Sequence, residues 1–243
     1  MSSDESCDRK RLRIATSDDD EDMQSVVAEA RPPLTKSHRI VRDESGKHHL
    51  LLLLTGSIAV MKIVELINEI QEKCGRDRII IKVVATENAI KLCNILKLEF
   101  EDIIYEDRDE WSIWRERGDQ VLHIELRKWA DSALIAPLDA NTLAKIATGL
   151  SDNLVTSIIR AWDLSKPCYF APAMNTHMWE NPLTLQHRSI LKSQLKFKEI
   201  CPIQKELICG DSGHGAMASV GTISSLIAAL VRDQLAIRRE CSS

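Results

Sequence analysis

Short apolar runs that alternate with amphipathic segments limit the folds open to this chain more than any other feature. The first run, Leu50 to Leu54, has the length of a strand and ends at Thr55-Gly56-Ser57. After it, apolar residues recur at helical spacing from Ile58 to Ile70 and stop before Cys74-Gly75. Strands that are apolar on both faces lie in parallel sheets covered by helices on both sides. The sequence therefore predicts an α/β protein with a mostly parallel sheet.

The same alternation continues to residue 237. Further strands are predicted at Ile79 to Ala85, Phe100 to Tyr105, Asp131 to Ala136, Cys168 to Ala171 and Phe197 to Cys201. Helices are predicted at Thr86 to Leu96, Asn141 to Ala147, Leu154 to Trp162, residues 183–195 and Thr222 to Ile237. Together these elements predict one domain over residues 48–238, followed by a short C-terminal tail at residues 239–243.

Residues 1–47 differ in composition from the rest of the chain. They hold 11 acidic and 9 basic residues, with no aromatic side chain and no apolar periodicity. Such a segment cannot bury enough apolar surface to offset the entropy of ordering it, so we expect a disordered tail. The basic cluster Arg9 to Arg13 could be a nuclear address or a docking patch, although a solvated run of charge is commoner. Ser17 stands before an acidic run, as a phosphorylation site would.

Composition excludes several classes of partner. The formal net charge is −4, so binding to bulk nucleic acid or to an anionic membrane surface is not expected. The run Leu50 to Leu54 is too short to cross a bilayer, and the N-terminus lacks the apolar stretch of a secretory signal. The 7 cysteines, an odd number without paired spacing, fit free thiols in a reducing compartment. We therefore expect a cytoplasmic protein.

Polar residues stand where four predicted strands end, and in a parallel sheet these ends line the ligand site. Gly56 allows a close backbone approach, and Ser57 can cap the following helix beside free N–H groups, as a phosphate site requires. Each end taken alone is equally typical of an ordinary helix cap or strand stop. The four ends are Thr55-Gly56-Ser57, Thr86-Glu87-Asn88, Pro137 to Thr142 and Pro172 to Asn175.

Two further side chains could carry chemistry. His123 shares a helical face with Arg127, where a structural histidine is the commoner case. Cys209 precedes a glycine-rich stretch that ends at Met217 and is typical of a mobile loop closing over a ligand, so its thiol is either an acid–base group or an inert side chain. A zinc site is conceivable, but its spacing matches no metal motif, and we expect no metal. Its ligands would be Cys201, Cys209, His187 and His214.

Longer motifs resemble the flavin-containing cysteine decarboxylases, a family that includes lantibiotic-processing decarboxylases and yeast halotolerance proteins. The likeness runs in unbroken order over about residues 49–232. It implies a flavodoxin-like, doubly wound parallel sheet in three layers, FMN as cofactor, and a homotrimer whose active sites lie between subunits. The matching stretches are Thr55 to Ser57, Val121 to Asp131, Ala136 to Leu143, Asp152 to Leu154, Arg160 to Asp163, Pro172 to Trp179 and Cys209 to Ala218.

The resemblance also implies roles by position. His123 matches the family's catalytic base, Cys209 matches the acid of its reductive step, and Asn175 would touch flavin and substrate together. The residues matched to the FMN site are Gly56, Ser57, Thr86, Glu87, Asn88, Asp139, Ala140, Asn141, Thr142 and Asn175. Those matched to the substrate site are Asn175, His177, Ile208, Cys209, Gly210 and Met217.

The activity that the resemblance implies is decarboxylation of 4′-phosphopantothenoylcysteine to 4′-phosphopantetheine, a lyase step of coenzyme A biosynthesis. In that chemistry the flavin oxidises the cysteinyl thiol to a thioaldehyde, the thioaldehyde accepts electrons as CO₂ leaves, and the flavin re-reduces the product. Fungal relatives with acidic extensions act as inhibitory subunits of a protein phosphatase, so a regulatory role is the alternative. The presence of His123, Asn175 and Cys209 together favours the enzyme.

Overall fold

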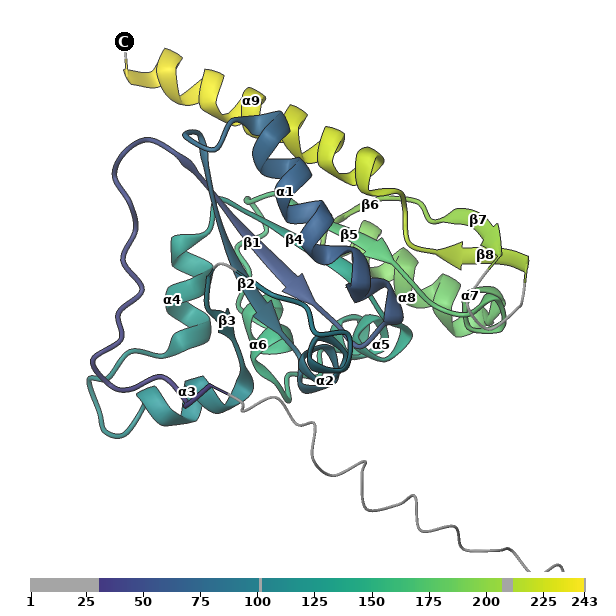
Figure 1. Ribbon diagram of the computed structural model, residues 1–243, viewed down its shortest axis with the longest axis horizontal. Helices are drawn as coiled ribbons and strands as arrows, with labels where there is room; N and C mark the ends of the chain where they lie inside the picture. Colours follow the sequence, from purple (N-terminus) through teal and green to yellow (C-terminus); the bar gives the residue numbers. More distant parts are fainter. Residues whose placement is uncertain (1–30, 101, 207–211, 243) are drawn as a thin grey trace, which may run out of the picture. The chain divides into compact units, whose positions relative to one another are not determined.

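The computed structural model describes residues 31–100, 102–206 and 212–242, and Pro32–Ser243 form one compact unit (Figure 1). The main sheet of this unit has six parallel strands in the order β3-β2-β1-β4-β5-β6. The chain therefore winds outward from β1 in both directions, which is the doubly wound arrangement. The strands are β1 His48–Leu54, β2 Ile79–Ala85, β3 Ile104–Tyr105, β4 Ser132–Leu138, β5 Cys168–Pro172 and β6 Lys198–Glu199.

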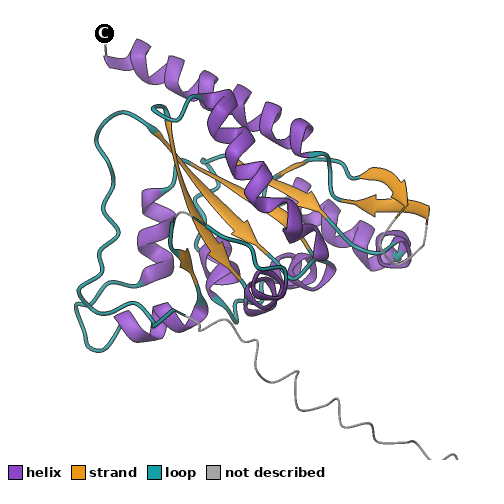
Figure 2. Cartoon of the chain, in the orientation of Figure 1, coloured by secondary structure: helices purple, strands orange, loops and turns teal. Residues whose placement is uncertain are grey.

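Helices cover both faces of this sheet (Figure 2). On one face Leu50, Leu52 and Leu54 of β1 pack with α1 and α9. On the other face Leu51 and Leu53 pack with α4 and α6, so the predicted three-layer, flavodoxin-like fold is confirmed. The helices are η2 Ile58–Lys62, α1 Ile63–Cys74, α2 Glu87–Ile95, α3 Asp107–Ile113, α4 Leu122–Trp129, α5 Ala140–Thr148, α6 Leu154–Arg160, α7 Thr176–Glu180, α8 Pro182–Ser193 and α9 Val220–Ser242.

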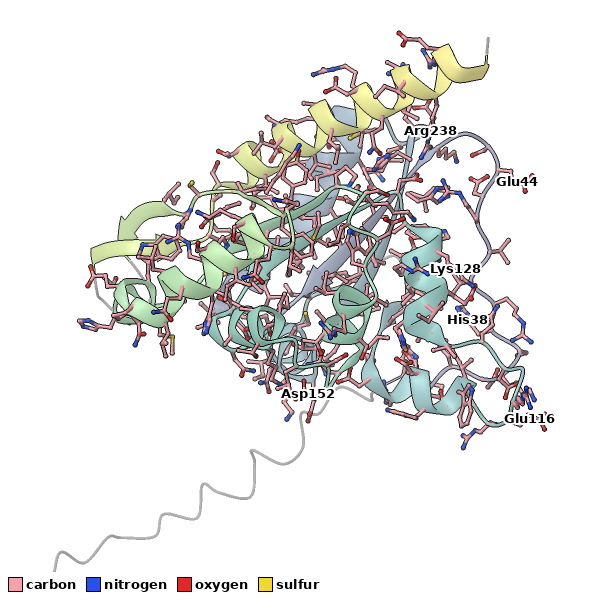
Figure 3. The ribbon with its side chains drawn as sticks, turned by 180° about the vertical axis from the view of Figure 1, so that it is seen from behind. His38, Glu44, Glu116, Lys128, Asp152 and Arg238 are labelled. Atoms are coloured by element: carbon pink, nitrogen blue, oxygen red, sulfur yellow. The ribbon has the colours of Figure 1, made fainter. Side chains whose placement is uncertain are left out.

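Residues 32–47, here called the N-terminal strap, pack against the domain. The predicted disordered tail is therefore wrong for this part of residues 1–47. The Leu34 amide donates to the Asp109 carboxylate at 2.9 Å, and the Lys36 ammonium pairs with Glu116 at 2.6 Å, on the side where α3 and α4 lie (Figure 3). Polar contacts to partners far away in the sequence order a segment whose composition is that of a tail. The basic cluster and Ser17 lie outside the described residues.

The C-terminal helix α9 runs to Ser242, so the predicted tail at residues 239–243 is also wrong. Arg238 fixes this end of the helix, because its guanidinium pairs with Asp131 at 2.5 Å. By length and composition α9 could cross a membrane. Only 28% of that segment is buried, and the buried side chains of Ile223 and Ile227 pack one face of α9 against the core of this domain.

Candidate active site

A pocket of about 1000 Å³ opens at the carboxyl ends of β1, β4 and β5. Strand order reverses between β1 and β4, and ligands of open α/β sheets bind at such a reversal. The pocket therefore lies where the sequence predicted it. Its lining consists of Gly56, Ser57, Ile58, Ala59, Met61, Lys62, Asn88, Asp139, Ala140, Asn141, Ala173, Met174, Asn175, Met178, Ile203, Gly215, Ala216 and Met217.

Thr55, next to the lining residue Gly56, joins the ends of the two central strands. Its buried hydroxyl donates to the Pro137 carbonyl at 2.8 Å and accepts from the Asp139 amide at 2.7 Å. Since both backbone groups are satisfied by one side chain, the ends of β1 and β4 are held in register. This contact brings the turn after β1 and the start of α5 to the same wall.

Gly56 is the point of closest packing in that wall. A Cβ atom at this position would lie 2.8 Å from the Asn88 Cβ atom and 3.1 Å from a carboxylate oxygen of Asp139. A side chain of any size would therefore push these two residues apart. The glycine keeps the surface bare where a ligand can approach the backbone.

Helices begin around the pocket with side-chain caps. Ser57 caps η2 by accepting from the Ala59 amide at 3.5 Å, and Asp139 caps α5 by accepting from the Thr142 amide at 2.6 Å. Asn175 caps α7 by accepting from the amide of His177 at 2.8 Å. The start of a helix carries partial positive charge and unpaired N–H groups, so this wall favours anionic ligand groups.

Much of the remaining lining is apolar. Four large side chains that line the pocket are partly in solvent: Ile58, Met61, Met178 and Ile203 are 45%, 46%, 54% and 36% exposed. Methionine side chains adapt to flat or irregular ligands and make favourable contacts with aromatic rings. Such a wall suits a planar aromatic ligand.

A hairpin of β7 Ile203–Glu206 and β8 Ser212–Ala216 closes one side of the pocket. The Gly215 carbonyl accepts from the Met174 amide at 2.9 Å and ties the hairpin to the loop after β5. Gly215 has φ of +125°, and a Cβ atom there would lie 2.6 Å from the Met174 carbonyl oxygen, so glycine is required. The predicted loop residues Ile208, Cys209 and Gly210 lie outside the described residues.

Most of the remaining predicted residues meet in the pocket. Gly56, Ser57, Asn88, Asp139, Ala140, Asn141, Asn175 and Met217 line it. Four do not line it: Thr86 and Thr142 are buried at helix starts, Glu87 pairs with Lys91 at 2.7 Å on the surface, and His177 is exposed on α7. No group of three metal-ligating side chains occurs among the described residues.

His123 lies apart from the pocket lining. It stands in the first turn of α4, where its Nδ1 atom lies 2.5 Å from the Oε1 atom of Glu110 on α3. Both side chains are partly buried, with 25% and 13% of their surface exposed. One chain therefore provides a pocket and a histidine–carboxylate pair at separate places.

Comparison with known proteins sets this site in a family. A family model described as Flavoprotein matches residues 38–232. The chain belongs to this flavoprotein family. Phosphopantothenoylcysteine decarboxylase of Mus musculus is 45% identical to this flavoprotein over 199 residues, which cover 82% of the chain and 95% of the mouse protein.

Two solved structures share the fold at similar identity. A cysteine-to-serine mutant of PPC decarboxylase, complexed with pantothenoylaminoethenethiol, is 47% identical to this flavoprotein with a TM-score of 0.70. That alignment covers 76% of the chain and 98% of the mutant. The FMN binding protein AtHal3 is 48% identical with a TM-score of 0.65, covering 76% of the chain and 95% of that protein.

Sequence reasoning missed part of the lining of this flavoprotein's pocket. Lys62 is the only lysine or arginine among the described lining residues, and Ile203 comes from a hairpin that was not predicted. Lys62 follows Ser57 by little more than one helical turn, and that spacing could have pointed to it. Ile203 carried no comparable signal, because a strand of four residues has too little pattern to recognise.

Proposed function

We propose that this flavoprotein binds FMN and decarboxylates 4′-phosphopantothenoylcysteine to 4′-phosphopantetheine, a lyase step of coenzyme A biosynthesis. The observation that carries the proposal is the pocket where Gly56, Asp139 and Asn175 meet at the strand ends. The mouse decarboxylase, 45% identical over 95% of its own length, supports this choice of substrate.

The pocket fits FMN in size and chemistry. A volume of about 1000 Å³ is at the upper end of the range for small-molecule sites. The bare backbone at Gly56 and the N–H groups at the start of α5 would hold the phosphate, and the methionine-rich wall would contact the ring. Bound FMN supplies a site that accepts and returns a hydride.

The substrate carries a carboxylate and a phosphate, and the pocket offers a group for each. Asn175 stands at the end of β5 on the pocket wall, where its amide can orient the carboxylate but transfers no proton. Lys62 is the cation of the described lining, and we assign it to the phosphate. The two anchors would hold the substrate at its two ends, Asn175 at the cysteinyl carboxylate and Lys62 at the 4′-phosphate.

The reaction requires a base for the thiol proton and an acid that protonates the product. We assign the base to His123 and the acid to Cys209, which lies outside the described residues. Because His123 does not line the pocket of its own chain, we propose a homotrimer in which a neighbouring copy brings its histidine to the pocket.

Two variants separate the steps. His123→Asn should retain FMN but release no CO₂. Cys209→Ser should release CO₂ and accumulate the oxidised enethiol, which lacks a hydride and a proton relative to the product. Mass spectrometry of the reaction mixture distinguishes these outcomes. Formation of phosphopantetheine at the wild-type rate by either variant would remove that residue from the mechanism.

Mixed oligomers test the shared site. Subunits with His123→Asn and subunits with Asn175→Ala should each be inactive alone. When the two are co-expressed, some pockets combine an intact Asn175 with a neighbour's intact His123, so activity should return. Co-expressed subunits that stay inactive would place both residues in the same chain's site.

The regulatory alternative and the location in the cell remain proposals of their own. We propose a cytoplasmic protein, in keeping with the free thiols of Cys74, Cys93, Cys168 and Cys201 in the described part of the chain. Binding to a protein phosphatase is tested by a pull-down with the full chain and with a chain that lacks residues 1–31. Since Pro32–Ser243 form a compact unit, the truncated protein should still fold.

A further inference from the structure

The carboxylate of Glu110 on α3 pairs with the imidazole of His123. The Oε1 atom of Glu110 lies 2.5 Å from the Nδ1 atom of His123, and no other described residue pairs with or hydrogen-bonds to the Glu110 carboxylate. The other ring nitrogen of His123, Nε2, has no hydrogen-bond partner among the described residues. One nitrogen is therefore bound and the other is available.

The chemistry of the pair determines which nitrogen is basic. An ionised carboxylate only accepts hydrogen bonds, so the proton of the neutral imidazole resides on Nδ1 and the lone pair on Nε2. We propose that Glu110 is a positioning residue, which fixes the tautomer and ring orientation of His123 for proton abstraction. This inference rests on the proposed function, in which His123 is the base.

The proton transfer is balanced within this pair. The S–H bond of the substrate breaks, its electron pair stays on sulfur, and the proton forms the Nε2–H bond of His123. Glu110 remains ionised and stabilises the resulting imidazolium, while the proton on Nδ1 stays where it is. The carboxylate thus acts without touching the substrate.

The helix that carries Glu110 is itself fixed on both sides of that residue. Asp109 is buried, and its two carboxylate oxygens accept from the amides of Leu34 and Glu106, each at 2.9 Å. The Ser112 hydroxyl donates to the Leu34 carbonyl at 2.6 Å. The N-terminal strap therefore braces α3 directly before and after Glu110, as a group that must aim a ring requires.

A structural ion pair alone would have different consequences. Partly exposed ion pairs contribute little to stability, so a purely structural role predicts small effects on stability and on turnover. A positioning role predicts loss of turnover with binding retained, because the substrate does not contact Glu110. The two roles are therefore distinguishable by kinetics.

The kinetic test compares three variants of the full chain with wild type. Glu110→Gln should lower kcat for 4′-phosphopantothenoylcysteine about 100-fold, while KM changes less than about threefold. Glu110→Asp, which keeps the charge, should have a kcat about tenfold higher than that of Glu110→Gln. Glu116→Gln is the matched control, because Glu116 follows α3, its side chain is 73% exposed, and among the described residues its carboxylate pairs with Lys36 alone. A wild-type kcat for Glu110→Gln would overturn the proposal.

A spectroscopic test does not depend on turnover. In the ¹⁵N-histidine NMR spectrum of the wild type, assigned with His123→Asn, the Nδ1 signal of His123 should be that of a protonated nitrogen and the Nε2 signal that of a bare one. The opposite tautomer would overturn the proposal. If the wild type does not decarboxylate the substrate, the proposed function fails, and this spectrum still shows whether His123 has the tautomer that pairing with Glu110 requires. Because the spectrum is recorded on the wild type, the test remains valid if Glu110→Gln does not fold.

Discussion

The Asp139 amide donates to the Thr55 hydroxyl at 2.7 Å, and this bond connects the end of β1 to the first turn of α5. The same hydroxyl donates to the Pro137 carbonyl, so one buried side chain satisfies two backbone groups at the reversal of strand order. Asp139 in turn packs over Gly56. The arrangement of Gly56 and Asp139 in the pocket wall thus depends on Thr55, which does not itself line the pocket.

Replacing Thr55 tests this dependence. Thr55→Val keeps the shape but leaves the Asp139 amide and the Pro137 carbonyl without their partner, which should lower the free energy of unfolding by roughly 1–3 kcal/mol. Chemical denaturation measures the change, and FMN content should fall with it. Thr55→Ser retains the hydroxyl and serves as the control. Equal losses in both variants would show that the hydrogen bonds are not the cause.

Gly56→Ala should weaken FMN binding. The added Cβ atom would lie 2.8 Å from the Asn88 Cβ atom, and overpacking of this kind costs about 1–3 kcal/mol, which corresponds to about 5- to 150-fold in affinity. Visible absorbance of the purified protein reports the retained flavin. Gly221→Ala is the control, since its Cβ atom would meet only ordinary contact at 3.6 Å from Glu69. Full flavin retention by Gly56→Ala would contradict the account.

Lys62→Gln should weaken recognition of the phosphate. Loss of a charge-assisted hydrogen bond costs about 1.5–3 kcal/mol, so kcat/KM for the phosphorylated substrate should fall about 10- to 100-fold. The same variant should process pantothenoylcysteine, which lacks the phosphate, nearly as well as the wild type does. An equal loss with both substrates would show that Lys62 does not bind the phosphate.

Stability should fall in mild acid because of His48. Burial lowers the pKa of His48 to about 4 from the ordinary 6.5, and its Nε2 atom lies 2.8 Å from the Ser132 hydroxyl. The unfolded chain takes up this proton below about pH 6.5 whereas the folded chain does not, so stability is full above that pH and declines toward about pH 4. Between pH 7 and 5 the loss should be on the order of 2 kcal/mol.

The variant His48→Gln isolates that contribution. Its stability at pH 7 can be lower, but the decline between pH 7 and 5, followed by denaturant unfolding, should be smaller than in the wild type. His177→Gln, at an exposed position, should leave the decline unchanged.

The carboxylate of Asp131, near His48, affects stability over a different range of pH. Burial would raise its pKa, but hydrogen bonds from His49, Arg238 and Arg42 hold it below the ordinary value of 3.8, so its contribution is lost only in stronger acid.

The strand ends were predictable because they follow from period and topology. Leu50 to Leu54 is apolar at every position, has the length of a strand and ends at a turn, which together favour a strand buried on both faces. Once such strands lie parallel, their carboxyl ends meet at one edge, so Gly56, Asp139 and Asn175 had to lie near one another. The pocket lining bears this out.

Contacts between distant residues were not predictable. Leu34 and Asp109 are 75 positions apart, and nothing in the charged composition of the strap indicates that a buried carboxylate accepts its amide. The C-terminal end of α9 was predicted too early for the same reason. Arg238 near this end pairs with Asp131, which is distant from it in the sequence. Helical spacing marked His123, but the distance between α4 and the pocket depends on packing that a local pattern does not contain.

The most direct test of the central claim is a single measurement on the purified wild-type chain. The protein is incubated with 4′-phosphopantothenoylcysteine, and the mixture is analysed by mass spectrometry alongside the visible spectrum of the protein. The account predicts a yellow protein that converts the substrate to 4′-phosphopantetheine, lighter by one CO₂. A yellow protein that leaves the substrate intact would contradict the proposed activity, and a colourless protein would contradict the FMN site as well.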